Sequence, residues 1–134
     1  MINENAKIIA VDFDGTIVED RFPEIGKPMP FAFDVLKKFQ VDGHRLILWT
    51  YRHGSKLDDA VTFCRDNGLE FYAVNKSFPE EKPDANLSRK IMADIFIDDR
   101  NLGGMKSWGE IYQQVTGIVE EAYKAKKKKW NRLF

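Results

Sequence analysis

The stretch that decides the fold is KIIAVDFDGT, residues 7–16. Its apolar part, residues 8–11, is typical of a strand that is buried on both faces of a parallel sheet. Two acids, Asp12 and Asp14, follow with one residue between them, and Gly15 lets the chain turn away. Ligands of open parallel sheets bind at the carboxyl ends of the strands. Carboxylates that converge there lose hydration and repel each other, so they indicate a cation or a function at this edge.

Hydrophobic periodicity extends this pattern into an alternating chain. The expected elements are strand 8–11, a helix from Pro30 to Asp42, strand 45–49, a helix from Ser55 to Asn67, strands 70–74 and 94–97, and a long C-terminal helix from Trp108. Capping boxes are expected at Ser55 with Asp58 and at Ser107 with Glu110. Proline-containing segments 17–30 and 75–89 are expected to be irregular. The order predicts an α/β fold, a three-layer sandwich with a short, mostly parallel, Rossmann-like sheet.

Size and composition indicate one globular domain over residues 1–134. Apolar residues make up 43% of the chain and charged residues 31%, which excludes a disordered or membrane-spanning class. A single cysteine, Cys64, excludes an intrachain disulfide and suits a reducing compartment. We therefore expect a cytoplasmic protein without a membrane partner.

The net charge is zero, but the charges are unevenly distributed. Residues 124–134 contain five lysines and Arg132 and no acid, so the rest of the chain carries six more acids than bases. This pattern predicts a basic C-terminal tail and not a general nucleic-acid surface.

Polar side chains follow three of the expected strands. They are Asp12 and Asp14, then Thr50 and Arg52, and finally Asp98 and Asp99. Because the carboxyl ends of parallel strands lie on one edge of the sheet, we expect these residues to converge. The four carboxylates are oxygen ligands of the kind that Mg²⁺ prefers, and Mg²⁺ often binds substrate phosphate as well.

Such a cluster allows phosphoryl transfer. A carboxylate such as Asp12 can attack phosphorus and form an aspartyl-phosphate. Asp14 is placed to exchange protons with the leaving oxygen and with water. The Thr50 hydroxyl suits a phosphoryl oxygen, and a lysine is needed as a point charge on the phosphate. The lysine candidates are Lys76, Lys82 and Lys90.

These motifs resemble those of the haloacid dehalogenase (HAD) superfamily, whose members are mostly Mg²⁺-dependent phosphatases. The resemblance runs from residue 7 to about residue 105 through four spaced motifs. They are the segment 12–16, the strand 46–50 that ends in Thr50, Lys90 upstream of the last strand, and the pair Asp98 and Asp99.

The resemblance implies a role for each of these residues. Asp12 is the expected nucleophile and Asp14 the acid/base, while Thr50 and Lys90 bind the phosphate. Mg²⁺ is expected on the Asp12 carboxylate, the backbone carbonyl at Asp14 and the Asp98 carboxylate, with Asp99 acting directly or through water. Arg52 is either a further substrate contact or a surface arginine.

The loop 17–30 is too short for the inserted cap of many superfamily members, so the chain resembles a capless phosphatase. A phosphorylated small molecule is the expected substrate, and a macromolecular substrate that docks on the basic tail is the alternative. Capless members often use a neighbouring subunit to cover the site, so a homo-oligomer is another alternative. A phosphoacceptor module is a further alternative, although such modules need an aspartate where Thr50 stands.

Overall fold

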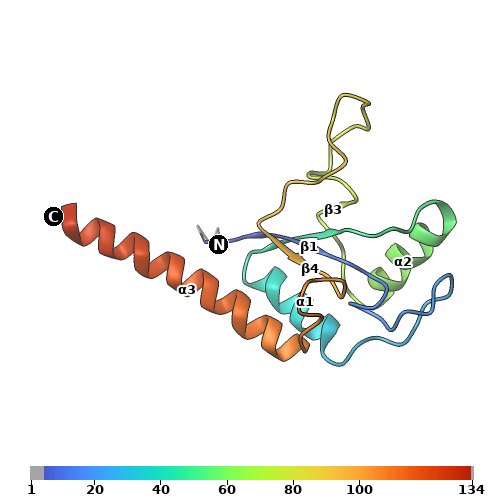
Figure 1. Ribbon diagram of the computed structural model, residues 1–134, viewed down its shortest axis with the longest axis horizontal. Coiled ribbons are helices and arrows are strands. Elements are labelled where there is room, and N and C mark those ends of the chain that lie inside the picture. Colours follow the sequence, from blue (N-terminus) through green and yellow to red (C-terminus); the bar gives the residue numbers. More distant parts are fainter. Residues whose placement is uncertain (1–4, 134) are drawn as a thin grey trace.

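The sheet of this computed structural model, which describes residues 5–133, is four-stranded and parallel throughout. Its strands are β1 (Ile8–Val11), β2 (Arg45–Leu48), β3 (Ala73–Val74) and β4 (Ile95–Ile97), in the spatial order β3-β2-β1-β4 (Figure 1). The apolar 8–11 run therefore occupies an interior position between two neighbours, as its composition predicts. The predicted α/β, Rossmann-like fold is confirmed, and no cap is evident.

All three helices pack on one face of the sheet. They are α1 (Ala32–Val41), α2 (Gly54–Asp66) and α3 (Trp108–Leu133). Alternate strand residues point into the shared core, because side chains alternate between the faces of a strand. This core includes Ile9, Val11, Leu46, Leu48 and Ile97 from the strands and Leu36, Phe39, Cys64, Trp108 and Ile111 from the helices.

The opposite face of the sheet is covered differently from the prediction. Its buried residues are Ala10, Ile47 and Ala73, and Ile91 packs on them from the irregular segment 75–94. This segment connects β3 at one edge to β4 at the other and rises from the body (Figure 1, yellow to gold). The expected three-layer sandwich therefore differs in its third layer. Within residues 5–133, this layer consists of irregular chain and contains no helix.

Most element ends lie within two residues of the expected ones, but the third strand is shorter and the second helix lacks its expected cap. The third strand is confined to Ala73–Val74, and the second helix begins at Gly54 after His53, which makes no side-chain cap, so the capping box at Ser55 is wrong. At the second box, the expected cap by Ser107 is present. Ser107 Oγ donates to Glu110 Oε1 at 3.1 Å and accepts from the Glu110 N–H at 3.3 Å.

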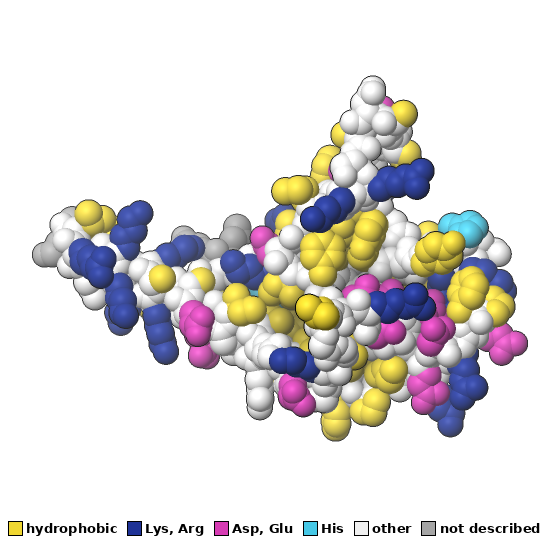
Figure 2. Space-filling model, in the orientation of Figure 1, with side chains coloured by type: hydrophobic (Ala, Val, Ile, Leu, Met, Phe, Trp, Pro, Cys, Tyr) yellow, Lys and Arg dark blue, Asp and Glu magenta, His cyan; other side chains and the backbone are white. Residues whose placement is uncertain are grey.

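The first part of helix α3 packs on the rest of the molecule, and its later part extends beyond it. Its buried residues are Trp108, Ile111 and Val115, near its start. From Tyr123 onward every described side chain is exposed, and the helix projects from the body (Figure 1). Lysine and arginine side chains stand along this projection, whereas acidic side chains gather on the body (Figure 2). Within residues 5–133, no helix has the length and apolarity needed to cross a membrane.

Candidate active site

Three carboxylates converge where β1 and β4 end side by side. Asp12 follows β1, and Asp98 and Asp99 follow β4. The Asp12 N–H donates to the Ile97 carbonyl oxygen at 3.0 Å, which continues the parallel pairing past the last strand residues. One oxygen from each carboxylate lies within 4.8 Å of the others. The predicted convergence of the first and last motifs is therefore present.

The turn after β1 links these acids. Thr16 is fully buried, and its hydroxyl lies 3.0 Å from Asp12 Oδ2 and accepts the Asp99 N–H at 3.0 Å. Trp108 of α3 donates its indole N–H to the Thr16 carbonyl oxygen at 3.0 Å. Gly15 has a φ of +84°, and a Cβ there would clash with the Asp99 carboxylate. The turn is thus specific for glycine and holds Asp12 and Asp99 together.

The clustered acids have an electrostatic consequence. The pKa of Asp12 is raised from 3.8 to about 8, first by burial, then by its hydrogen bond with Asp99 and by the charge of Asp98. The hydrogen bond from Thr16 opposes this rise. At neutral pH and without a bound cation, the cluster therefore retains a proton that isolated carboxylates would lose.

This donor set fits a divalent cation. Mg²⁺ takes oxygen ligands at about 2.0–2.1 Å, so two ligands on opposite sides of the ion lie about 4.2 Å apart. Oxygens that already lie within 4.8 Å of one another need only small side-chain movements to reach that spacing. A dication would also neutralise the charge that raises the Asp12 pKa.

Asp14 lies outside this cluster, and its carboxylate is bound by Arg52. Arg52 Nε donates to Asp14 Oδ2 and Arg52 Nη2 donates to Asp14 Oδ1, both at 2.7 Å. The Arg52 side chain is 1% exposed, and its pKa is raised, chiefly by the hydrogen bond with Asp14. Of the two alternatives for Arg52, the surface arginine is therefore wrong, because Arg52 is a buried partner of Asp14.

Further contacts fix Arg52 in place. Its guanidinium donates to the backbone carbonyl oxygens of Pro23, Glu24 and Lys56 at 2.8 to 3.3 Å. It also lies over the rings of Phe13 and Phe22, at 5.1 and 5.2 Å from their centroids. Arg52 thereby ties the loop 17–30 to the start of α2 and to the turn after β1.

Thr50 stands at the end of β2 with its hydroxyl oriented by the backbone. The Thr50 Oγ1 accepts the Arg52 N–H at 3.1 Å, so its own hydroxyl hydrogen can donate to a ligand. The Thr50 N–H donates to Asn75 Oδ1 at 2.8 Å. Asn75 follows β3 with a φ of 54°, in the left-handed region that asparagine tolerates better than most residues.

A pocket of about 630 Å³ opens over these strand ends. Residues that line it include Asp12, Asp14, Thr50, Arg52, Asp98 and Arg100. The structure thus brings together most of the predicted site residues, with Asp99 beside the pocket in the carboxylate cluster.

Lys90 is the predicted site residue that the structure does not bring to this pocket. It is exposed on the irregular segment 75–94, which rises from the body, and it is absent from the pocket lining. Arg100, which none of the sequence motifs includes, lines the pocket instead. The feature of the sequence that points to Arg100 is its position directly after Asp98 and Asp99. Thr16 and Asn75 were also missed, because their role is to position other groups.

No protein-family model matches the chain, and no curated protein does either. A solved structure does match. It is a conserved protein from Bacteroides thetaiotaomicron that is 56% identical in sequence and superposes with a TM-score of 0.80. The match covers 84% of this chain and 91% of the other. The chain therefore belongs to the same protein family as this conserved Bacteroides thetaiotaomicron protein.

Proposed function

We propose that the chain is a Mg²⁺-dependent phosphomonoester hydrolase of the haloacid dehalogenase type, with Asp12 as its nucleophile. The observation that carries this proposal is the convergence of Asp12, Asp98 and Asp99, whose oxygens lie within 4.8 Å of one another at the carboxyl edge of a parallel sheet. Asp12 also lines the adjacent pocket.

Asp12 and Asp98 are the residues that would hold the metal, with Asp99 beside them. When bound, Mg²⁺ supplies positive charge that offsets the repulsion between a carboxylate and a phosphate and polarises the phosphoryl oxygens. The Thr16 hydroxyl bonds to the Asp12 carboxylate and to the Asp99 N–H, and this fixes the two residues relative to each other.

The reaction takes place in two steps. An oxygen of Asp12 attacks phosphorus, and the bond from phosphorus to the ester oxygen breaks, so that the leaving group departs as an alcohol after gaining a proton. Water then attacks the aspartyl-phosphate, which releases phosphate and restores the Asp12 carboxylate. The Thr50 hydroxyl donates to a phosphoryl oxygen, and Arg100 contributes positive charge at the pocket.

Asp14 is the acid/base candidate in both steps. In the structure both of its oxygens accept hydrogen bonds from Arg52. Each of these oxygens has a second lone pair that can carry a proton, so Asp14 can give a proton to the leaving oxygen and take one from water while its bonds to Arg52 remain.

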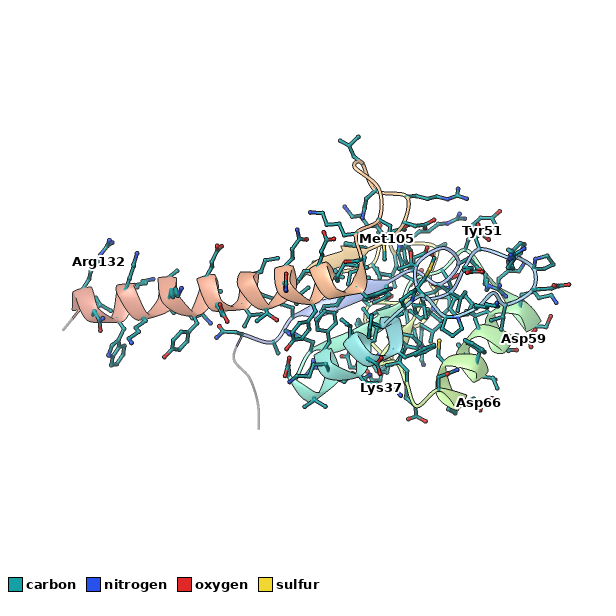
Figure 3. All side chains as sticks on the ribbon, turned by 90° about the horizontal axis from the view of Figure 1, so that it is seen from below. Lys37, Tyr51, Asp59, Asp66, Met105 and Arg132 are labelled. Carbon is teal, nitrogen blue, oxygen red and sulfur yellow. The ribbon has the colours of Figure 1, made fainter. Side chains whose placement is uncertain are left out.

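The test is hydrolysis of an aryl phosphate with and without Mg²⁺. Asp12→Asn should abolish turnover, while Asp66→Asn, which changes an exposed acid on α2, should leave it intact (Figure 3). Chelation of divalent ions should abolish turnover in the parent chain. Turnover by the Asp12→Asn chain would contradict the mechanism, and a single stable phosphorylation without turnover would indicate a phosphoacceptor module instead.

A second comparison tests whether Arg100 or Lys90 binds the substrate phosphate. Because Arg100 lines the pocket and Lys90 does not, Arg100→Ala should reduce kcat/KM by about 10-fold or more, as expected for loss of a charge-assisted hydrogen bond. Lys90→Ala should have a smaller effect. The reverse order would show that the segment 75–94 moves Lys90 onto the substrate.

A further inference from the structure

We propose that the substrate is a nucleoside monophosphate, whose planar base stacks on Tyr51 while its phosphate lies at Asp12 and Thr50. This inference rests on the proposed function, because it uses the same residues for the phosphate. It adds the class of leaving group, which the carboxylate cluster does not specify.

The pocket is larger than a phosphate needs. At about 630 Å³ it falls in the range of about 300–1,000 Å³ that is typical of pockets for small organic ligands. Three aromatic side chains line it, namely Phe22, Trp49 and Tyr51. The leaving group therefore has both space and apolar surface beside the phosphate position.

Tyr51 is the most exposed of these aromatic side chains. It is 92% exposed, and it directly follows Thr50 in the chain. It lies at the end of the molecule that carries α2, far from the C-terminal end of α3 (Figure 3). An aromatic ring next to the phosphate-binding hydroxyl offers a stacking surface for any base, because every base has a flat π-face.

Phe22 is a second exposed ring, and it is held in place. One side of it faces the Arg52 guanidinium at 5.2 Å, and Arg52 is itself fixed by Asp14. Phe22 nevertheless remains 51% exposed. Single exposed apolar residues are ordinary on protein surfaces, whereas two exposed aromatic rings on one pocket indicate a ligand with a flat apolar part.

The charged groups of the pocket select a sugar and a single phosphate. Asp20 lines the pocket as an exposed carboxylate, the type of acceptor that binds ribose hydroxyls in dinucleotide sites. Arg52 is already paired with Asp14, so Arg100 is the cation that the pocket lining offers to phosphate. Asp14 is neutralised by Arg52, and the proposed metal offsets Asp12 and Asp98, so Asp20 is the acid of the pocket lining that would repel a second phosphate. A monophosphate with a hydroxylated sugar and a flat base meets all of these conditions.

Equilibrium binding to the Asp12→Asn chain tests the inference without turnover. Calorimetry with Mg²⁺ should show adenosine 5′-monophosphate binding at least about fivefold more tightly than ribose 5-phosphate, which has a hydroxyl in place of the base. Adding Tyr51→Ala should bring the two affinities within about twofold of each other, while Tyr51→Phe should preserve the difference. Tyr123→Ala, at an exposed tyrosine on α3, is the matched control and should change nothing.

Equal affinities for the two ligands, tighter binding of O-phosphotyrosine than of the nucleotide, or an unchanged preference in the Tyr51→Ala chain would each overturn the inference. The ratio of kcat/KM for the same two ligands in the parent chain repeats the test if the Asp12→Asn chain does not fold. Base-dependent binding without any hydrolysis would support the nucleotide site and contradict the hydrolase, so the two failures are distinguishable.

Discussion

At the scale of single residues, the site is defined by how two acids are neutralised. Asp14 receives its positive partner from within the chain, because both of its oxygens accept bonds from Arg52. Asp12 has two acids, Asp98 and Asp99, as neighbours, and its pKa rises to about 8. This contrast makes Asp12 a candidate metal ligand and leaves the Asp14 carboxylate outside the cluster.

The first prediction concerns the pH dependence of stability. The pKa of Asp12 is about 8 in the folded chain and 3.8 as an ordinary group, so between these values the folded state binds more protons than the unfolded state. The contribution of Asp12 to the free energy of unfolding of the metal-free protein should therefore fall as the pH rises from about 4 to about 8. Asp12→Asn should remove this fall in thermal melts, and Mg²⁺ should reduce it. An identical pH profile in the Asp12→Asn chain would contradict the assignment.

The second prediction concerns the pair of Arg52 and Asp14. Arg52→Ala leaves Asp14 without its partner and should lower the free energy of unfolding by about 3–5 kcal/mol. Arg52→Lys keeps the charge but loses the two-pronged geometry, so it should lie between the parent and the alanine variant. Denaturant unfolding gives both values. A loss below about 0.5 kcal/mol for Arg52→Ala would show that the pair is not a structural element of the site.

At the scale of elements, the turn after β1 positions the first and last motifs relative to each other. The glycine in this turn matters for two reasons, its φ of +84° and the proximity of the Asp99 carboxylate. The sequence indicates the turn through its acid-glycine pattern. The contact with Asp99 could not be predicted from it, since Asp99 arrives from a strand more than eighty residues further along the chain.

The third prediction separates these two reasons. Gly15→Ala should destabilise the fold by about 1–2 kcal/mol through its backbone conformation. By displacing Asp99, it should also weaken Mg²⁺ binding by about 10-fold or more. Gly103→Ala is the matched control, because Gly103 has a φ of +95° but a Cβ there would contact nothing within 4 Å. The control should lose stability while keeping its Mg²⁺ affinity, as measured by calorimetry. Equal Mg²⁺ affinities in the two variants would contradict the role of the turn.

At the scale of the whole molecule, alternation of strands and helices in the sequence predicts the parallel sheet and thereby the edge at which the site forms. It does not predict which faces the helices cover. All three pack on the face that holds Ile9 and Leu46, whereas among the residues that the structure describes the other face is covered by irregular chain. Phe96 illustrates the consequence. It lies on this other face, opposite Ala10, and is 38% exposed, because within residues 5–133 no helix packs there.

The fourth prediction concerns the basic end of α3. The side chains of residues 124–133 are exposed, so deleting residues 124–134 should change the melting temperature by only a few degrees. Ile111→Ala, at a buried position of the same helix, should cost about 2–5 kcal/mol in the free energy of unfolding. A larger loss on truncation than on Ile111→Ala would show that the projecting end stabilises the fold.

The central claim is that Asp12 and Asp98 hold one divalent ion at the carboxyl edge of the sheet. A crystal structure with Mn²⁺ in place of Mg²⁺ tests it most directly, because anomalous scattering locates the ion. The account predicts a single peak bonded to oxygens of Asp12 and Asp98 at about 2.0–2.2 Å. A peak elsewhere, or no peak at a saturating Mn²⁺ concentration, would contradict it.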